Sequence, residues 1–309
     1  MAQQGLVIFF ALLAAVCMAI GIVVRQRATC EVPADEGVST TMITTLLRAR
    51  LWWAGTAVAV IGYAFQAVAL LYGSLLVVQP LLVSSLLFAL PLSARLAGRR
   101  VASAEWAWAI ALTIALALFV LMARPRPGLY RGQELAWTVA IAVIAPIVVF
   151  CVAFGARSTG RRRAVLIAIA VGVLFGVIAV LTKLVMFELA EDGVGGLLQL
   201  PSLYLLATLG VTAMLLQQSA FHAGALQMSV PTMLVLEPVV AVTLGALVLN
   251  EHLSVSGYET VALPVAIGAM AAATIALGRG EGAYEEQLEA AMATRPEPSS
   301  REVVQRPQP

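Results

Sequence analysis

The chain has 309 residues, of which 61% are hydrophobic and only 12% are charged, and its mean hydropathy is +0.94. A soluble domain carries about a quarter charged side chains, so the composition excludes an ordinary soluble protein and predicts an all-α integral membrane protein. The net charge of +2 identifies no partner. We expect the lipid bilayer to be one, and no nucleic acid.

Nine apolar runs are long enough to cross a bilayer, which takes about 20 mostly apolar residues in a helix. The first run has basic residues after it rather than before it, the reverse of a cleaved signal peptide, so we expect it to be retained. Short breaks at Gly73 and Gly224 predict turns between antiparallel helices. The runs are 5–24, 51–72, 74–96, 104–123, 134–155, 164–186, 201–222, 226–249 and 258–278.

The arginines predict how these spans are oriented. If the N-terminus is outside, the arginine-rich loops 25–50, 95–100 and 157–163 all lie inside, together with Arg279. Few arginines then lie outside, in the stretch 124–131. By the positive-inside rule, the sequence predicts an outer N-terminus and a cytoplasmic C-terminus.

An internal repeat relates the two ends of the chain. Residues 66–118 recur without a gap as residues 217–269, a shift of 151 positions. Spans one to four then match spans six to nine, and the single linking span makes the second group enter the membrane from the opposite face. The predicted fold is therefore a 4+1+4 inverted repeat, an arrangement found in many secondary transporters.

Four regions follow from this repeat. Residues 1–123 form the first repeat, 124–160 the linking span and 161–279 the second repeat. Residues 280–309 form a cytoplasmic tail that is too polar and proline-rich to bury a core. Within the tail, 281–293 has the composition of a short acidic surface helix.

Glu237 is the leading candidate site residue, because it is an acid deep in an apolar span and directly precedes Pro238. Proline removes a backbone donor and frees the carbonyl of Leu234. An ionisable group at membrane depth is costly and tends to face a cavity or a partner. Glu237 could bind a cation or a proton, or it could be a protonated acid bonded to a neighbouring helix.

Prolines also mark the third span of each half. Gln79 precedes Pro80 in span three, and Pro231 and Pro238 lie in span eight. We expect helix breaks at these three prolines, a pattern that points to a transporter's midplane site. Plain structural bends are the alternative, and Gln79 is a candidate for lining the pathway.

The remaining candidates are polar residues of spans two, six and seven. Gln66 and Gln217 line a pathway or join helices by hydrogen bonds. Gln218 and His222 project together four residues apart, and His222 titrates near neutral pH or is solvated at the interface. Lys183, the only lysine, either reaches the interface or forms a gating ion pair with Glu188 or Glu237.

Several kinds of chemistry leave no trace in the sequence. It contains no GxxxxGK[ST] loop, no HExxH and no GxSxG, so we expect neither ATP-driven transport nor an enzyme. The three cysteines show no pairing or metal spacing. We expect no cofactor, and a metal ligand set is unknown.

One hairpin resembles a known family. The segment NEHLS, with Glu251, Leu253 and Ser254, resembles the glutamate-x-leucine-serine motif of the drug/metabolite transporter superfamily, which includes the EamA-like proteins. In the first repeat only Ser103 agrees, because Arg100 and Ala102 stand at the other two positions. Nine spans with an outer N-terminus look more like the magnesium-transporter-like branch, the NIPA family. The resemblance implies an inverted-repeat fold and transport.

Three functions are compatible with these observations. The first is a secondary transporter or exporter of a small solute such as a metabolite, an amino acid or a drug-like molecule. The second is a Mg²⁺ or other divalent-cation transporter of the NIPA type. The third is a non-transporting membrane partner of an envelope-synthesis complex, with the tail as contact element. One lysine against 18 arginines, with abundant alanine, suits a GC-rich bacterial genome, and we expect the chain in a bacterial plasma membrane. A homodimer is left open.

Overall fold

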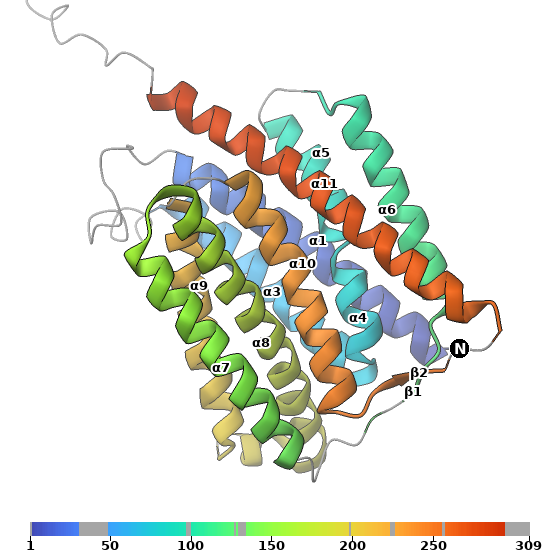
Figure 1. Ribbon diagram of the computed structural model, residues 1–309. Helices are drawn as coiled ribbons and strands as arrows, with labels where there is room; N and C mark the ends of the chain where they lie inside the picture. Colours follow the sequence, from blue (N-terminus) through green and yellow to red (C-terminus); the bar gives the residue numbers. More distant parts are fainter. Residues whose placement is uncertain are drawn as a thin grey trace, which may run out of the picture.

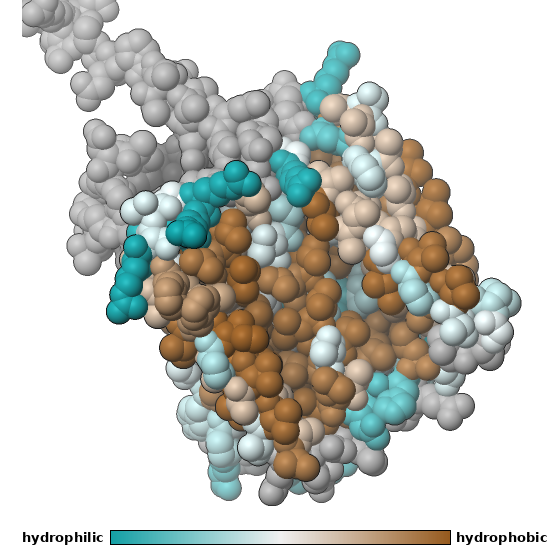
Figure 2. All heavy atoms as spheres, in the orientation of Figure 1, coloured by the Kyte–Doolittle hydropathy of each residue, from teal (hydrophilic) through white to brown (hydrophobic). Residues whose placement is uncertain are grey.

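The computed structural model describes residues 2–30, 49–96, 100–126, 128, 134–197, 199–222, 226–254 and 257–293. Within these ranges the chain is almost entirely helical (Figure 1). In the described residues, eight helical stretches are long and apolar enough to cross a membrane, one of them the interrupted stretch Leu75–Arg95, and the helix Pro201–His222 has a shorter apolar stretch, Pro201–Gln217. Hydrophobic side chains cover the middle of the face shown in Figure 2. The expected all-α architecture with long apolar helices is confirmed, with eight such stretches and one shorter one in the described residues where nine spans were expected.

The helices lie close to the predicted apolar runs along the chain. They are α1 (Ala2–Cys30), α3 (Arg50–Tyr72), α4 (Leu75–Leu82), α5 (Ser85–Leu96), α6 (Ser103–Met122), α7 (Glu134–Arg157), α8 (Gly160–Leu197), α9 (Pro201–His222), α10 (Leu226–Leu247) and α11 (Glu259–Ala293). Two short strands, β1 (Pro125–Arg126) and β2 (His252–Leu253), pair antiparallel.

The third span is broken, but not at the expected residue. Pro80 lies inside α4, and the helix ends two residues later, at Leu82, before a turn at Val83 and Ser84. The backbone turns there through bonds from Val83 N to Pro80 O and from Ser84 N to Leu81 O, while the Ser84 hydroxyl also donates to Leu81 O at 2.6 Å. The break therefore depends on tight three-residue turns, which satisfy the carbonyls at the helix end.

The predicted breaks at Pro231 and Pro238 are wrong. Both prolines lie inside the single helix α10. Each proline leaves one carbonyl of the preceding turn without its helical partner, and the rest of the helix continues because its neighbours hold it. At Pro231 that neighbour is α11, since a Cβ added at Gly278 would lie 3.1 Å from the Pro231 Cβ.

Two helices are longer than the sequence predicts. α8 continues past residue 186, where the sixth run was expected to end, so Glu191 and Asp192 are exposed residues of the helix. Gly193 interrupts its helical geometry with a φ of 68°, in the region that favours glycine. α11 runs through residue 280 to Ala293, so the helix expected over 281–293 is its continuation. Residues 294–309 of the expected tail lie outside the described residues.

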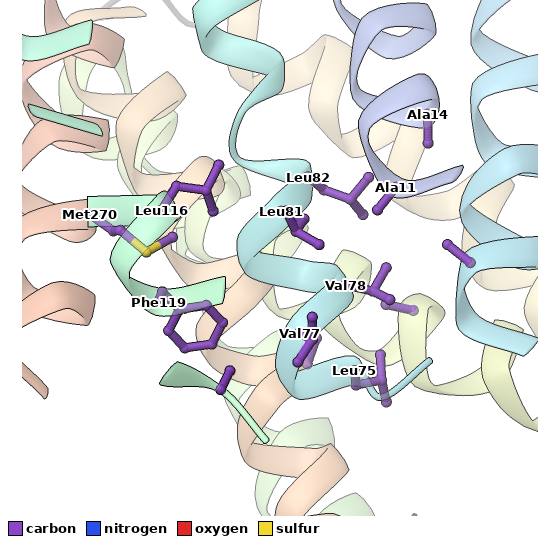
Figure 3. Close-up of a cluster of buried hydrophobic side chains, with 14 of the residues drawn as sticks. Ala11, Ala14, Leu75, Val77, Val78, Leu81, Leu82, Leu116, Phe119 and Met270 are labelled. Atoms are coloured by element: carbon purple, nitrogen blue, oxygen red, sulfur yellow. The ribbon is translucent and has the colours of Figure 1, made fainter. Parts of the chain in front are cut away.

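The core is centred on α4, whose eight residues are all buried. Figure 3 shows its apolar side chains between Ala11 and Ala14 of α1 on one side and Phe119 and Met270 on the other. Helices in a bilayer associate largely by such close van der Waals packing. This position makes α4 the helix around which the site is built.

Glycines bring two pairs of helices into especially close contact. A Cβ at Gly21 of α1 would lie 2.9 Å from the Ala59 Cβ of α3, and one at Gly176 of α8 would lie 2.6 Å from the Val240 Cβ of α10. Small residues allow this approach of the backbones. The pairs α1/α3 and α8/α10 are therefore tightly packed units.

One end of the bundle collects the N-terminal start of α1, the turn between α3 and α4, and the β1–β2 pair (Figure 1). Gly73 of the turn lies against Val7 of α1. We call this side the N-terminal end. It corresponds to the outer side if the arginine-based orientation is right.

Candidate functional site

A buried ion pair lies at the N-terminal end of the bundle. Lys183 of α8 places its Nζ 2.6 Å from Oε1 of Glu251, which follows α10. The Ser74 hydroxyl donates to the other carboxylate oxygen of Glu251 at 2.7 Å, and Lys183 Nζ donates to the carbonyl of Gly73. Lys183 is 4% exposed and Glu251 1% exposed. We call Gly73, Ser74, Lys183 and Glu251 the ion-pair cluster.

Local geometry explains how the chain delivers these groups. Ser74 is the N-cap of α4 and accepts from Leu76 N at 3.1 Å, so its hydroxyl is fixed at the start of the helix. After α10, Asn250 adopts a φ of 55°, and Glu251 N donates to Gly245 O at 3.0 Å. This turn folds the Glu251 side chain back over the end of α10.

The charges of Lys183 and Glu251 can be buried because the two groups form an ion pair with each other. Removing an ammonium and a carboxylate from water costs several kcal/mol each, and only close pairing with extra hydrogen bonds offsets that cost. The interfacial position expected for Lys183 is therefore wrong. Glu251, an acid that was not expected as a partner, lies 2.6 Å from Lys183.

Glu237 lies at the middle of α10, on the face that points into the protein. Met233, Ala241 and Leu244 share that face and are 5% exposed or less. Glu237 between them keeps partial exposure. Tyr63 of α3 lies within electrostatic range of Glu237, so an acid and a phenol from the two halves of the chain lie in the same region.

Two buried amides carry polar atoms without a hydrogen-bond partner in the described structure. They are Oε1 of Gln66 on α3 and Nε2 of Gln79 on α4. Gln66 is 5% exposed and Gln79 is 1% exposed. A buried polar atom without a hydrogen-bond partner lowers the stability of the fold by about 1–3 kcal/mol. These side chains are therefore destabilising unless a further group, such as a bound solute, forms hydrogen bonds with them.

Of the candidate residues on α9, the structure describes the side chain of Gln217 only. Gln217 is half-buried on a helix that packs mainly against α8. The side chains of Gln218 and His222 lie outside the described residues. Among the residues that the structure describes, no three acids, histidines or cysteines come together as metal ligands.

Three residues of this region were not predicted as site residues: Ser74, Tyr63 and Glu251. Glu251 stood out only as part of a hairpin motif and as the counterpart of Arg100 in the repeat. The single lysine was a signal that a buried partner exists. Its identity depends on the turn after α10, which sequence reasoning does not resolve.

A protein of Corynebacterium glutamicum, described as uncharacterized, is 36% identical to this chain over 279 residues. The match covers 90% of this chain and 96% of that protein. No family model matches the chain. No solved structure matches it either.

Proposed function

The chain belongs to the same family as the Corynebacterium glutamicum protein, and we propose that it is a secondary transporter of a small solute, of the drug/metabolite transporter type. Solute passes a central site around Glu237 as the two halves move against each other. The observation that carries this proposal is the place of Glu237, an acid on the inward face of a spanning helix that still keeps accessible surface.

This exposure supports an accessible space inside the bundle. A side chain that points inward between buried neighbours has accessible surface only if it borders a hollow. Tyr63 repeats the pattern on α3, since it is 47% exposed while Ala59, Gln66 and Leu70 around it are buried. In the proposal Tyr63 and Glu237, which lie within electrostatic range of each other, border the same hollow.

Helix contacts support the inverted repeat. In the first half α1 packs against α3 and against α4 and α5, and in the second half its repeat counterpart α8 packs against α9 and α10. The counterparts α4 and α10 touch each other, and so do α6 and α11. A pseudo-twofold axis between the halves would generate these matching contacts, and transporters place their sites at such repeat interfaces.

The residues favour a solute with hydrogen-bonding groups and a positive charge, or a solute coupled to a cation. Gln66 offers an acceptor, Gln79 a donor and Glu237 a carboxylate. Mg²⁺ favours octahedral oxygen coordination and keeps several waters, commonly using one or two carboxylates. A divalent cation therefore remains the alternative cargo, with Glu237 as its carboxylate.

The test is transport by the purified full chain in liposomes. Amino acids, organic cations and Mg²⁺ are offered under gradients of H⁺ and Na⁺, and Glu237→Gln is compared with Glu191→Gln. Glu191 is exposed near the end of α8, so the same substitution there should leave transport unchanged. Glu237→Gln should abolish ion coupling in a chain that still folds.

Three results would contradict this assignment. Transport by Glu237→Gln with unaltered coupling would remove Glu237 from the mechanism. Uptake of Mg²⁺ alone would move the assignment to a divalent-cation transporter. No movement of any solute, together with a stoichiometric partner that is lost when residues 281–309 are deleted, would favour the non-transporting membrane partner.

A further inference from the structure

We propose that the ion-pair cluster is the gate that closes the N-terminal end of the central path. This inference rests on the proposed transport function. The cluster joins the two halves of the chain: Gly73 and Ser74 belong to the first half, and Lys183 and Glu251 to the second.

The cluster lies where two closely packed helix pairs meet, beside the direct contacts of α4 with α10 and of α3 with α8. α1 and α3 form one tight pair and α8 and α10 the other. The α3–α4 turn extends from the first pair, while Lys183 lies on α8 and Glu251 directly follows α10. Relative motion of the pairs at this end must therefore separate Ser74 from Glu251 and Gly73 from Lys183.

The cluster also lies directly beyond the unpaired amides. Gln79 is five residues past Ser74 on α4, which is about 7 Å along the helix axis. Gln66 is seven residues before Gly73 on α3, or about 10 Å from the turn. Opening the cluster would therefore give access to the polar side chains assigned to the solute.

The chemistry of the cluster suits a contact that opens and closes. A buried ion pair contributes little net stability compared with apolar residues of the same size, because desolvation offsets the attraction. When the end opens, water solvates the separated charges, so the open state is not strongly penalised. An apolar plug has no comparable compensation, since opening exposes its whole surface to water.

The experiment measures access to Val78, which lies one turn below Ser74 on α4 and is fully buried. Val78→Cys is made in the full-length chain with its three native cysteines replaced by alanine. A membrane-impermeant methanethiosulfonate reagent is added from the side of the membrane on which Tyr72→Cys is labelled. This means intact cells if that side is the outer one, and inverted membrane vesicles otherwise. The rate of modification is compared in Lys183→Met, Glu251→Gln, Ser74→Ala and Arg124→Gln backgrounds.

Arg124→Gln is the matched control, because Arg124 also forms an ion pair at this end, with Glu259 at 3.6 Å, but is largely exposed. We expect Lys183→Met and Glu251→Gln to speed modification by about tenfold or more, since an unpaired buried charge favours the open state. Ser74→Ala removes one hydrogen bond and should speed it by about threefold. Arg124→Gln should leave the rate unchanged.

Two outcomes overturn the gate. One is an unchanged rate in Ser74→Ala and in whichever charge variants reach the membrane folded, as judged by a single gel-filtration peak. The other is an equal acceleration by Arg124→Gln, which would indicate general loosening. This readout needs no solute, so acceleration in a chain that transports nothing would support the gate while removing the proposed function.

Discussion

Gly176 of α8 lies so close to α10 that a Cβ at its position would come within 2.6 Å of the Val240 Cβ and 3.0 Å of the Glu237 carbonyl oxygen. The glycine thus fixes α8 beside the turn of α10 that carries the central acid. Two consequences follow from this contact. The packing around Glu237 depends on the absence of a side chain at Gly176. The same helix, α8, also carries Lys183 of the ion-pair cluster.

Replacing Gly176 by alanine should therefore destabilise the protein. The added methyl group overlaps a β-branched side chain and backbone on α10, and overpacking of this kind costs about 1–3 kcal/mol. The measurement is thermal unfolding of the purified protein in detergent. Gly210→Ala on α9 is the matched control, because nothing lies within 4 Å of a Cβ added there. A Gly176→Ala protein as stable as the Gly210→Ala protein would show that α8 and α10 are not held this tightly.

Lys183→Met should be strongly destabilising, while the double change Lys183→Met with Glu251→Gln should recover most of the loss. Removing one partner of a buried pair leaves an unpaired charge and costs about 3–5 kcal/mol. Neutralising the second partner removes that charge. Arg124→Gln breaks an ion pair with a 70% exposed arginine and should cost less than about 1 kcal/mol. Additive losses in the double variant would contradict a direct coupling between Lys183 and Glu251.

Gln79→Leu should separate stability from function. The unpaired Nε2 of Gln79 is fully buried, and an apolar residue of similar size removes its desolvation penalty, so the protein should be unchanged or up to about 1 kcal/mol more stable. Transport should fall, because the donor assigned to the solute is lost. Ser84→Ala on the same span is the control. Its hydroxyl already bonds to Leu81 O at 2.6 Å, so it should lose some stability and keep transport.

The spans were predictable because each needs only a long apolar run, and hydropathy shows such runs directly. The positions at which the helices are interrupted were harder to predict. Proline marks a missing donor, but whether the helix stops depends on neighbours, and so α4 ends after Pro80 whereas α10 continues through Pro231 and Pro238. Hydropathy also placed the end of α8 too early, since polar residues such as Glu191 and Asp192 can continue a helix into water.

The candidate site was predicted in part. A buried acid and buried amides are costly and therefore conspicuous in an apolar sequence, which is why Glu237, Gln66 and Gln79 stood out. The Lys183–Glu251 pair was not predicted, because the two residues are 68 positions apart and Glu251 follows the end of its helix. Tyr63 was missed for another reason, since a single aromatic residue in a span is ordinary and only its exposure distinguishes it.

The orientation of the chain leads to a last prediction. In the cysteine-free chain, Tyr72→Cys at the N-terminal end and Arg157→Cys at the end of α7 are both exposed positions, at opposite ends of the bundle. Intact cells are treated with a membrane-impermeant maleimide. Because the arginine-rich loops should stay in the cytoplasm, Tyr72→Cys should be labelled at once, and Arg157→Cys only after the membrane is permeabilised. The reverse pattern would place the ion-pair cluster on the cytoplasmic side, and comparable labelling of both would mean that the chain inserts in two orientations.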